Sequence, residues 1–174
     1  MKRYILTIAL IGAALLAAGA SRAQTPAANP LDVIPDKMPF DVPYGAPISL
    51  ERAQAVLAAA VAEAKAHDWK MDLAVVDSGG NLIAFARMDG AQLASIAISE
   101  HKARTAATFR RETKIFESGI QGGLVYQVTL DGVIGSRGGI PIIEGGKLIG
   151  AIGVSGGTGS QDEVIAKAGA ALIK

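Results

Sequence analysis

The sequence contains no cysteine among its 174 residues. Disulfide bonds, thiolate catalysis, iron–sulfur clusters and cysteine-ligated zinc are therefore excluded. Histidine is almost as scarce, because His67 and His101 are the only imidazoles that can bind a metal or act as a base. We expect the hydrophobic core, rather than covalent cross-links, to stabilise the fold.

The chain also lacks an excess of charge of either sign, with 17 Lys and Arg residues against 16 Asp and Glu residues. Residues 1–23 hold three of the basic residues and no acid, so 17 − 3 = 14 basic and 16 acidic residues follow them, a net charge of −2. Nucleic-acid binding needs a basic surface. The composition therefore excludes DNA and RNA as partners.

Beyond the N-terminus the chain has no run of about 18 consecutive apolar residues, which a membrane span would need. The N-terminus itself carries Lys2 and Arg3, then an uncharged and mostly apolar run over residues 4–18, then Ser21-Arg22-Ala23. This pattern is typical of a secretory signal peptide. We expect cleavage after Ala23 and a periplasmic or secreted protein without a membrane span.

Proline is concentrated in one segment, since six of the seven prolines lie between residues 24 and 47. A proline every four or five residues is incompatible with a helix or an interior strand. The spacing predicts an extended arm over residues 24–48, either a disordered leader or an arm that packs on a neighbouring surface. Residues 49–174 are enough for one domain with its own core.

Within residues 49–174, the apolar residues alternate between helical spacing and short runs interrupted by tight turns. Ser49 is a good N-cap, and the residues after it repeat at helical spacing. Helices are predicted over 50–66, 92–110 and 161–173. Glycine-containing turns predict two β-hairpins, 71–76 with 82–88 and 140–143 with 148–154. Between residues 111 and 132 we expect a short helix that ends at glycines, followed by a strand or loop.

Helix, hairpin, helix, hairpin, helix is an α+β pattern. Strands joined by tight turns pair antiparallel, and helices must cover the apolar faces of the sheet that they form. The sequence therefore predicts a central antiparallel sheet of two hairpins packed between helices.

The segment Gly153-Val154-Ser155-Gly156-Gly157 fits the G-x-S-x-G pattern of a nucleophilic serine. That chemistry needs a base to accept the serine proton, and in the α/β-hydrolase order the histidine follows the serine. His67 and His101 both precede it. We predict no catalytic residue here and interpret the glycines as a route from strand to helix. The backbone amides of residues 155–160 remain a weaker candidate for an anion site.

A basic run, consisting of Lys102, Arg104, Arg110, Arg111 and Lys114, lies near the end of the second predicted helix. Such a run is typical of a solvated face, although arginines lining a groove would suit carboxylates. His101, between Glu100 and Lys102, has the setting of a solvated residue. His67 lies at the C-terminal end of the first helix, where the helix dipole favours an imidazole that is partly positive.

Four blocks, in this order and spacing, resemble the GlcG/HbpS-type family of small proteins: "LAVVDSGGNLIAFARMDGA", "KARTAATF", "GGIPIIEGGKLIGAIGVSGG" and "QDEVIAKAGA". The resemblance runs from about residue 49 to residue 174. It implies an α+β domain that assembles into homo-oligomers. It also implies binding of haem by exported members, with a link to haem or iron sensing.

By this resemblance we expect an exported protein that binds haem or a similar flat anionic ligand. A histidine near the end of the first helix is associated with haem binding in the family; Lys65 aligns with it here, and His67 lies two residues further on. The predicted ligand-binding residues are His67, His101, Arg104 and Arg110, and a membrane sensor is a candidate partner. The alternative is an accessory enzyme or binding protein of small-organic-acid catabolism, with Asp77, Asp89, Glu144 or Asp162 transferring protons.

Overall fold

The structure is a computed structural model that describes residues 32–38 and 40–174. The predicted signal peptide, residues 1–23, and residues 24–31 of the predicted arm lie outside the described residues. The chain divides into two units, residues 1–36 and residues 37–174. The description below concerns the second unit. Within the described residues, no helix is both long enough and apolar enough to cross a membrane.

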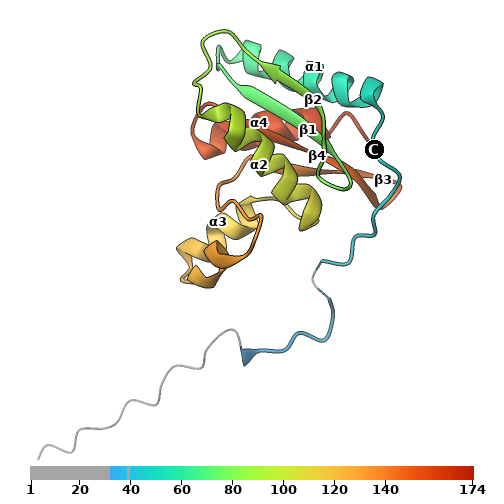
Figure 1. Ribbon diagram of the computed structural model, residues 1–174, viewed down its shortest axis with the longest axis vertical. Coiled ribbons are helices and arrows are strands. Elements are labelled where there is room, and N and C mark those ends of the chain that lie inside the picture. Colours follow the sequence, from blue (N-terminus) through green and yellow to red (C-terminus); the bar gives the residue numbers. More distant parts are fainter. Residues whose placement is uncertain (1–31, 39) are drawn as a thin grey trace, which may run out of the picture. The chain divides into compact units, whose positions relative to one another are not determined.

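The second unit contains four α-helices and four strands, with the strands in two consecutive pairs (Figure 1). In chain order they are α1 (Leu50–Ala66), β1 (Asp72–Asp77), β2 (Leu82–Arg87), α2 (Ser95–Thr108), α3 (Lys114–Gln121), the 3₁₀ helix η2 (Val125–Thr129), β3 (Gly139–Glu144), β4 (Lys147–Ser155) and α4 (Gly159–Ala170). The α+β prediction and both hairpins are confirmed, and α1 has the predicted bounds. The 3₁₀ helix stands where a strand or loop was expected.

The two hairpins join into one antiparallel sheet of strand order β2-β1-β4-β3. β1 and β4, the central strands, pair with each other over six residues. The second turn needs left-handed backbone, with φ of 53° at Gly145 and 75° at Gly146, which glycine adopts without steric cost. In the first turn, Asp77 Oδ1 accepts hydrogen bonds from the backbone N–H groups of Gly79 and Asn81.

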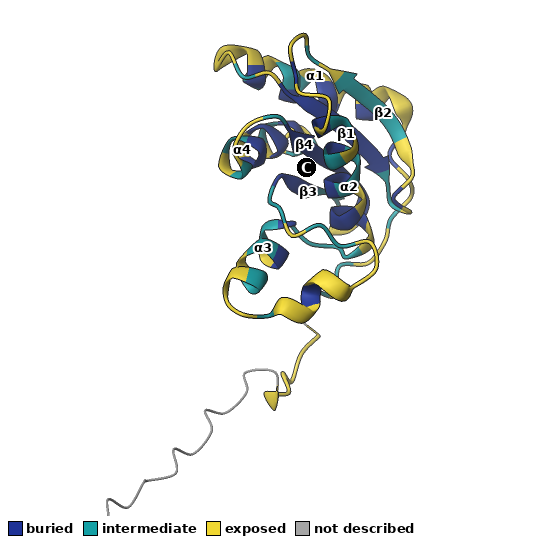
Figure 2. Ribbon diagram, turned by 60° about the vertical axis from the view of Figure 1, so that its left-hand side comes forward, coloured by how far each residue is buried: buried dark blue, intermediate teal, exposed yellow. Residues whose placement is uncertain are grey.

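Helices cover both faces of the sheet, with α1 and α4 on one face and α2 on the other (Figure 1). Successive β1 side chains point to opposite faces. Leu73 and Val75 pack with α1 and α4, whereas Ala74 and Val76 pack with the alanines of α2. Burial on both faces explains the unbroken apolar run of β1. Exposed residues instead dominate the α3–η2 segment (Figure 2).

Helix α2 lies close to the sheet because both surfaces carry small residues. A Cβ atom at Gly153 would collide with the backbone oxygen of Ser99, and one at Gly139 would collide with the backbone oxygen of Lys102. Ala103, Ala106 and Ala107 are fully buried in the same contact. Gly153 therefore allows the backbone of α2 to approach β4 closely.

Residues 40–48 of the predicted arm pack against the domain, so this part of the arm is not a disordered leader. β4 begins before β1 pairs with it, which leaves backbone groups of Leu148 and Ile149 without a strand on that side. The arm supplies partners: Pro43 O accepts from Leu148 N, Gly45 N donates to Leu148 O, and Ile48 N donates to Ile149 O. Tyr44 adds a hydroxyl hydrogen bond of 2.8 Å to Thr108 O.

Candidate functional site

The end of the sheet where β1 starts and β2 ends carries a cavity, which we call cavity A. Its volume is about 410 Å³, within the range of small-molecule pockets. Four lining residues are apolar: Val61, Trp69, Ala86 and Met88. Five are charged: Lys65, Lys70, Arg87, Asp68 and Asp89. Three cations against two carboxylates give the lining one net positive charge, which favours an anionic ligand.

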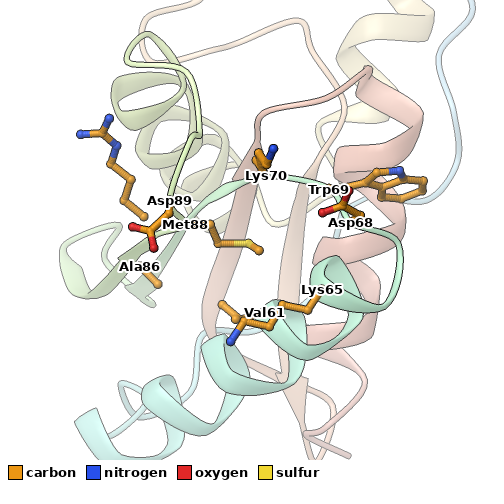
Figure 3. A pocket seen from close by; sticks show the side chains of 9 residues that line it. Val61, Lys65, Asp68, Trp69, Lys70, Ala86, Met88 and Asp89 are labelled. Atoms are coloured by element: carbon orange, nitrogen blue, oxygen red, sulfur yellow. The ribbon is translucent and has the colours of Figure 1, made fainter.

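Three segments of the chain meet around cavity A (Figure 3). Val61 and Lys65 rise from α1, and Met88 extends from the end of β2 toward the centre of the ring of labelled side chains. Asp68, Trp69 and Lys70 come from the loop between α1 and β1. The cavity therefore exists only because α1 and the first hairpin are packed together.

The loop turns sharply because α1 ends in a left-handed residue. His67 is the C-cap of α1, and Asp68 has a φ of 54°, a conformation that Asp tolerates better than most residues. Trp69 N then donates a 2.9 Å hydrogen bond back to Ala64 O. The His67 ring stacks on Trp69 at a centroid distance of 4.3 Å, and its Nε2 lies 3.1 Å from Glu63 Oε1. His67 thus adjoins cavity A through Trp69 without lining it.

A second cavity, cavity B, of about 340 Å³, shares residues 68–70 with cavity A. Gly156, Gly157 and Gln161, at the start of α4, also line it. Two of the backbone amides there already have acceptors within the chain: Gly157 N donates to Asp162 Oδ1, and Thr158 N donates to Gln161 Oε1. These two amides are therefore not available to an anion at the candidate site of residues 155–160, which stays a prediction.

Ser155 is buried, and its hydroxyl donates a 2.9 Å hydrogen bond to Ser95 Oγ. The partner is a second hydroxyl rather than a base, and Gln92 Nε2 donates to the same Ser95 oxygen. A serine activated as a nucleophile would need a proton acceptor at this position. The structure therefore supports the prediction of a structural turn here.

The other predicted ligand-binding residues lie along α2 and beyond its end, and none of them lines cavity A or cavity B. His101 is half-buried. Arg104 is exposed and packs beside Gly80, in the turn at the far end of the first hairpin. Arg110 donates a 3.0 Å hydrogen bond to Val42 O and lies over the Tyr44 ring, so it holds the arm. Whether these side chains bind a ligand stays a prediction.

For Lys102, the expectation of a solvated face is wrong. Its side chain is 1% exposed, and Nζ donates to Asp162 Oδ2 at 2.7 Å and to Val154 O at 3.0 Å. Lys102 lies on the face of α2 that packs on the sheet. Its charge can be buried there because Asp162 of α4 supplies a carboxylate partner. Burial raises the pKa of Asp162, whereas the Lys102 ammonium acts in the opposite direction.

Asp72 is a second buried carboxylate, at the start of β1. It is 0% exposed, and neither of its side-chain oxygens has a hydrogen-bond partner among residues 32–38 and 40–174. Its cross-strand partners are Arg87 in β2 and Ser155 in β4. Burial raises the pKa of Asp72, and the positive charge of Arg87 opposes that effect.

The predicted ligand-binding residues did not include Lys70, Asp72, Arg87 or Met88. A signal for three of them existed: Lys70, Asp72 and Arg87 are charged residues at the open ends of the apolar runs of one hairpin, and such ends lie side by side. Met88 had no such signal in the sequence, because an apolar residue at the end of an apolar run is typical of the core. In the described part of the chain, no group of three or more His, Asp or Glu residues is arranged to hold a metal ion.

Known proteins are similar to this chain in sequence and in fold. Protein GlcG of Escherichia coli strain K12 is 44% identical over 108 residues, which cover 62% of this chain and 81% of that protein. A solved double mutant of Streptomyces reticuli HbpS is 28% identical with a TM-score of 0.70, covering 82% of this chain and 97% of its own. A solved complex of PduOC with heme is 28% identical with a TM-score of 0.67, covering 74% and 96%.

The sequence also matches the model of a protein family over most of the domain. Residues 48–171 match the family described as haem degrading protein HbpS-like. The match includes all helices and strands named above, and the predicted resemblance to the GlcG/HbpS-type family is confirmed. This chain belongs to the HbpS-like family.

Proposed function

We propose that the protein binds haem, or a similar flat anionic ligand, in cavity A. The observation that carries the proposal is the lining, which combines an apolar wall with three cationic side chains, in a chain whose relatives include a protein solved with heme. A flat ring with peripheral carboxylates needs both kinds of contact. Haem would bring an iron atom and a strong visible absorption band.

The residues of cavity A suit the two parts of such a ligand. Val61, Ala86 and Met88 offer apolar surface for the ring. Lys65, Lys70 and Arg87 offer ammonium and guanidinium groups for the carboxylates. His67 does not line the cavity and would reach an iron atom there only by leaving its stack on Trp69; it remains the candidate imidazole ligand.

A hemin titration of the purified protein, followed at the Soret band, tests the proposal. We expect a saturable shift at micromolar hemin. The paired substitution Lys70→Gln with Arg87→Gln should weaken binding about five- to tenfold, a loss of roughly 1 kcal/mol or more. Arg104→Gln, which removes an exposed arginine of α2, is the matched control. No saturable shift would end the proposal, and an effect confined to Arg104→Gln would move the site to α2.

The same titration identifies the iron ligand. His67→Ala and His101→Ala remove the only imidazoles of the chain one at a time. We expect a changed Soret maximum for His67→Ala and an unchanged one for His101→Ala. The reverse pattern would support the prediction from the sequence that His101 binds the ligand.

We further propose that the protein is exported and handles haem or iron outside the cytoplasm, with a membrane sensor as its partner. The supports are the N-terminal sequence and the family membership. Cell fractionation with mass spectrometry of the N-terminus should find the chain in the periplasm or medium, beginning at Gln24. A pull-down from membranes with the hemin-loaded protein tests the sensor.

We also propose that the protein forms homo-oligomers. Five large apolar side chains are exposed on the α3–η2 segment: Ile115, Val125, Tyr126, Val128 and Leu130. Residues 118–130 contain no charged residue, so two copies of this surface can meet without repulsion. Light scattering after size-exclusion chromatography measures the mass, which Val128→Glu should reduce toward one chain.

A second candidate function is an accessory role in small-organic-acid catabolism, favoured by the 44% identity to Protein GlcG. Three of its candidate acids have structural partners: Asp77 holds a turn, Glu144 pairs with Arg52, and Asp162 pairs with Lys102. Asp89 lines cavity A and remains the candidate for proton transfer. Turnover of a panel of small hydroxy and keto acids, lost in Asp89→Asn, would support this function.

A further inference from the structure

The buried carboxyl group of Asp72 is the most unusual group of the described chain. Both of its oxygens lack hydrogen-bond partners, and the residue is 0% exposed. An ionised carboxylate in this state is costly, and such a group can relieve the cost by taking up a proton. An aspartate at position 72 costs stability when it is ionised, which raises the question of what its protonation does in the protein.

The strand register places Asp72 under the first turn of α2. Residues 74 and 76 of β1 face α2, so Asp72, two residues earlier, faces the same way. The groups that face it on β4 and α2 are the uncharged hydroxyls of Ser155 and Ser95. On β2 the cross-strand partner is Arg87, an exposed residue whose positive charge acts on Asp72 without a hydrogen bond to it.

The remaining charged groups near this end of the sheet are either paired or on the surface. Lys102, further along α2, is held by Asp162. Lys70 and Asp89, on the flanking loops, are exposed. Among the residues that the structure describes, Arg87 is the charged group that shifts the pKa of Asp72, which it lowers against the effect of burial.

Arg87 also lines cavity A. A ligand carboxylate that pairs with Arg87 would cancel the positive field that helps Asp72 to ionise. We propose that Arg87 couples the occupancy of cavity A to the protonation of Asp72, so that an anionic ligand binds together with a proton. This inference rests on the proposed function for the identity of the ligand, whereas the link between Arg87 and Asp72 is a property of the ligand-free protein.

The ligand-free protein tests that link through a double-mutant cycle. Unfolding by urea is measured from pH 4.5 to pH 8.5 for the wild type, Asp72→Asn, Arg87→Gln and the double variant. Arg87→Gln imitates the neutralisation of Arg87 by a ligand. In its presence Asp72 should hold its proton to higher pH in the folded chain, so the stability gained by Asp72→Asn should keep growing to higher pH and be larger at pH 8.5 than in the Arg87 background. Additive effects of the two substitutions at every pH would overturn the proposal.

Hemin binding provides the second test. The dissociation constant is measured from pH 5.5 to pH 8.5 for the wild type, Asp72→Asn and the exposed control Asp131→Asn. One linked proton allows the wild-type affinity to fall by at most about tenfold per pH unit relative to Asp72→Asn. Because Asn is permanently neutral, we expect Asp72→Asn to match the wild type at low pH and to bind more tightly at high pH, while Asp131→Asn follows the wild type.

The two tests separate the two claims. Equal pH dependence in the wild type and Asp72→Asn would refute the proton linkage even when hemin binds. Failure of every variant to bind hemin would refute the proposed function, and the double-mutant cycle would still decide whether Arg87 controls the protonation of Asp72.

Discussion

Two aspartates of this protein are buried against α2 in opposite ways. Asp162, at the start of α4, has Lys102 Nζ at 2.7 Å on one oxygen and Gly157 N at 3.0 Å on the other. Asp72, at the start of β1, has no hydrogen-bond partner among the described residues. Burial raises the pKa of both. The difference shows that a buried carboxylate with a cationic partner can hold two helices together, as Asp162 does for α2 and α4. The protonation of a buried carboxylate without a partner depends instead on pH and on nearby charges.

Breaking the paired site should have the largest effect. Lys102→Met keeps most of the apolar volume but leaves Asp162 buried without its cation, and we expect a loss of about 3–5 kcal/mol in the free energy of unfolding. Urea denaturation measures it. The double variant with Asp162→Asn removes both charges and should recover part of the loss. A single variant within about 1 kcal/mol of the wild type would show that the pair does not join α2 to α4 as described.

At the unpaired site, the same kind of charge removal should have the opposite sign. The pKa of Asp72 is higher in the folded chain than in the unfolded chain, so its favourable contribution is complete below the unfolded pKa and is lost as pH rises through the folded pKa. Asp72→Asn avoids that loss, which amounts to about 1.4 kcal/mol for each unit of pKa shift.

We therefore expect Asp72→Asn to unfold at higher urea concentration than the wild type at pH 8 and at a similar concentration near pH 4. The exposed Asp131→Asn serves as the control. If Asp72→Asn were instead less stable at pH 8, the carboxylate would have an ionised partner in solution, and the contrast with Asp162 would disappear.

An exposed contact between a carboxylate and an imidazole should have the smallest effect, against which the other two can be compared. Glu63 and His67 form a contact of 3.1 Å on the surface of α1, with both side chains about two-fifths exposed. Water and salt screen such pairs, so Glu63→Gln should change the free energy of unfolding by only about 0.3–0.5 kcal/mol. A change above 1 kcal/mol in the same urea assay would mean that His67 and its stacking on Trp69 depend on this contact.

Much of the fold was predictable from local patterns. Ser49 accepts a hydrogen bond from Arg52 N, as expected of an N-cap, and Gly145-Gly146 turns the second hairpin. The candidate site was less predictable. His67 was singled out for its place at the end of α1, and it does adjoin cavity A. Arg104 and Arg110 were singled out for their charge alone, which says nothing about the direction in which a side chain points.

Residues 49–174 by themselves determined the helices, the hairpins and the family, because caps, turn residues and apolar spacing act over a few neighbouring positions. Only the tertiary structure decided which charges are buried and which of them are paired. Lys102 and Asp162 are 60 residues apart in the chain, and Asp72 faces Arg87 through the register of two strands. Such contacts depend on how α2, α4 and the sheet pack together, and no local pattern of the sequence records that packing.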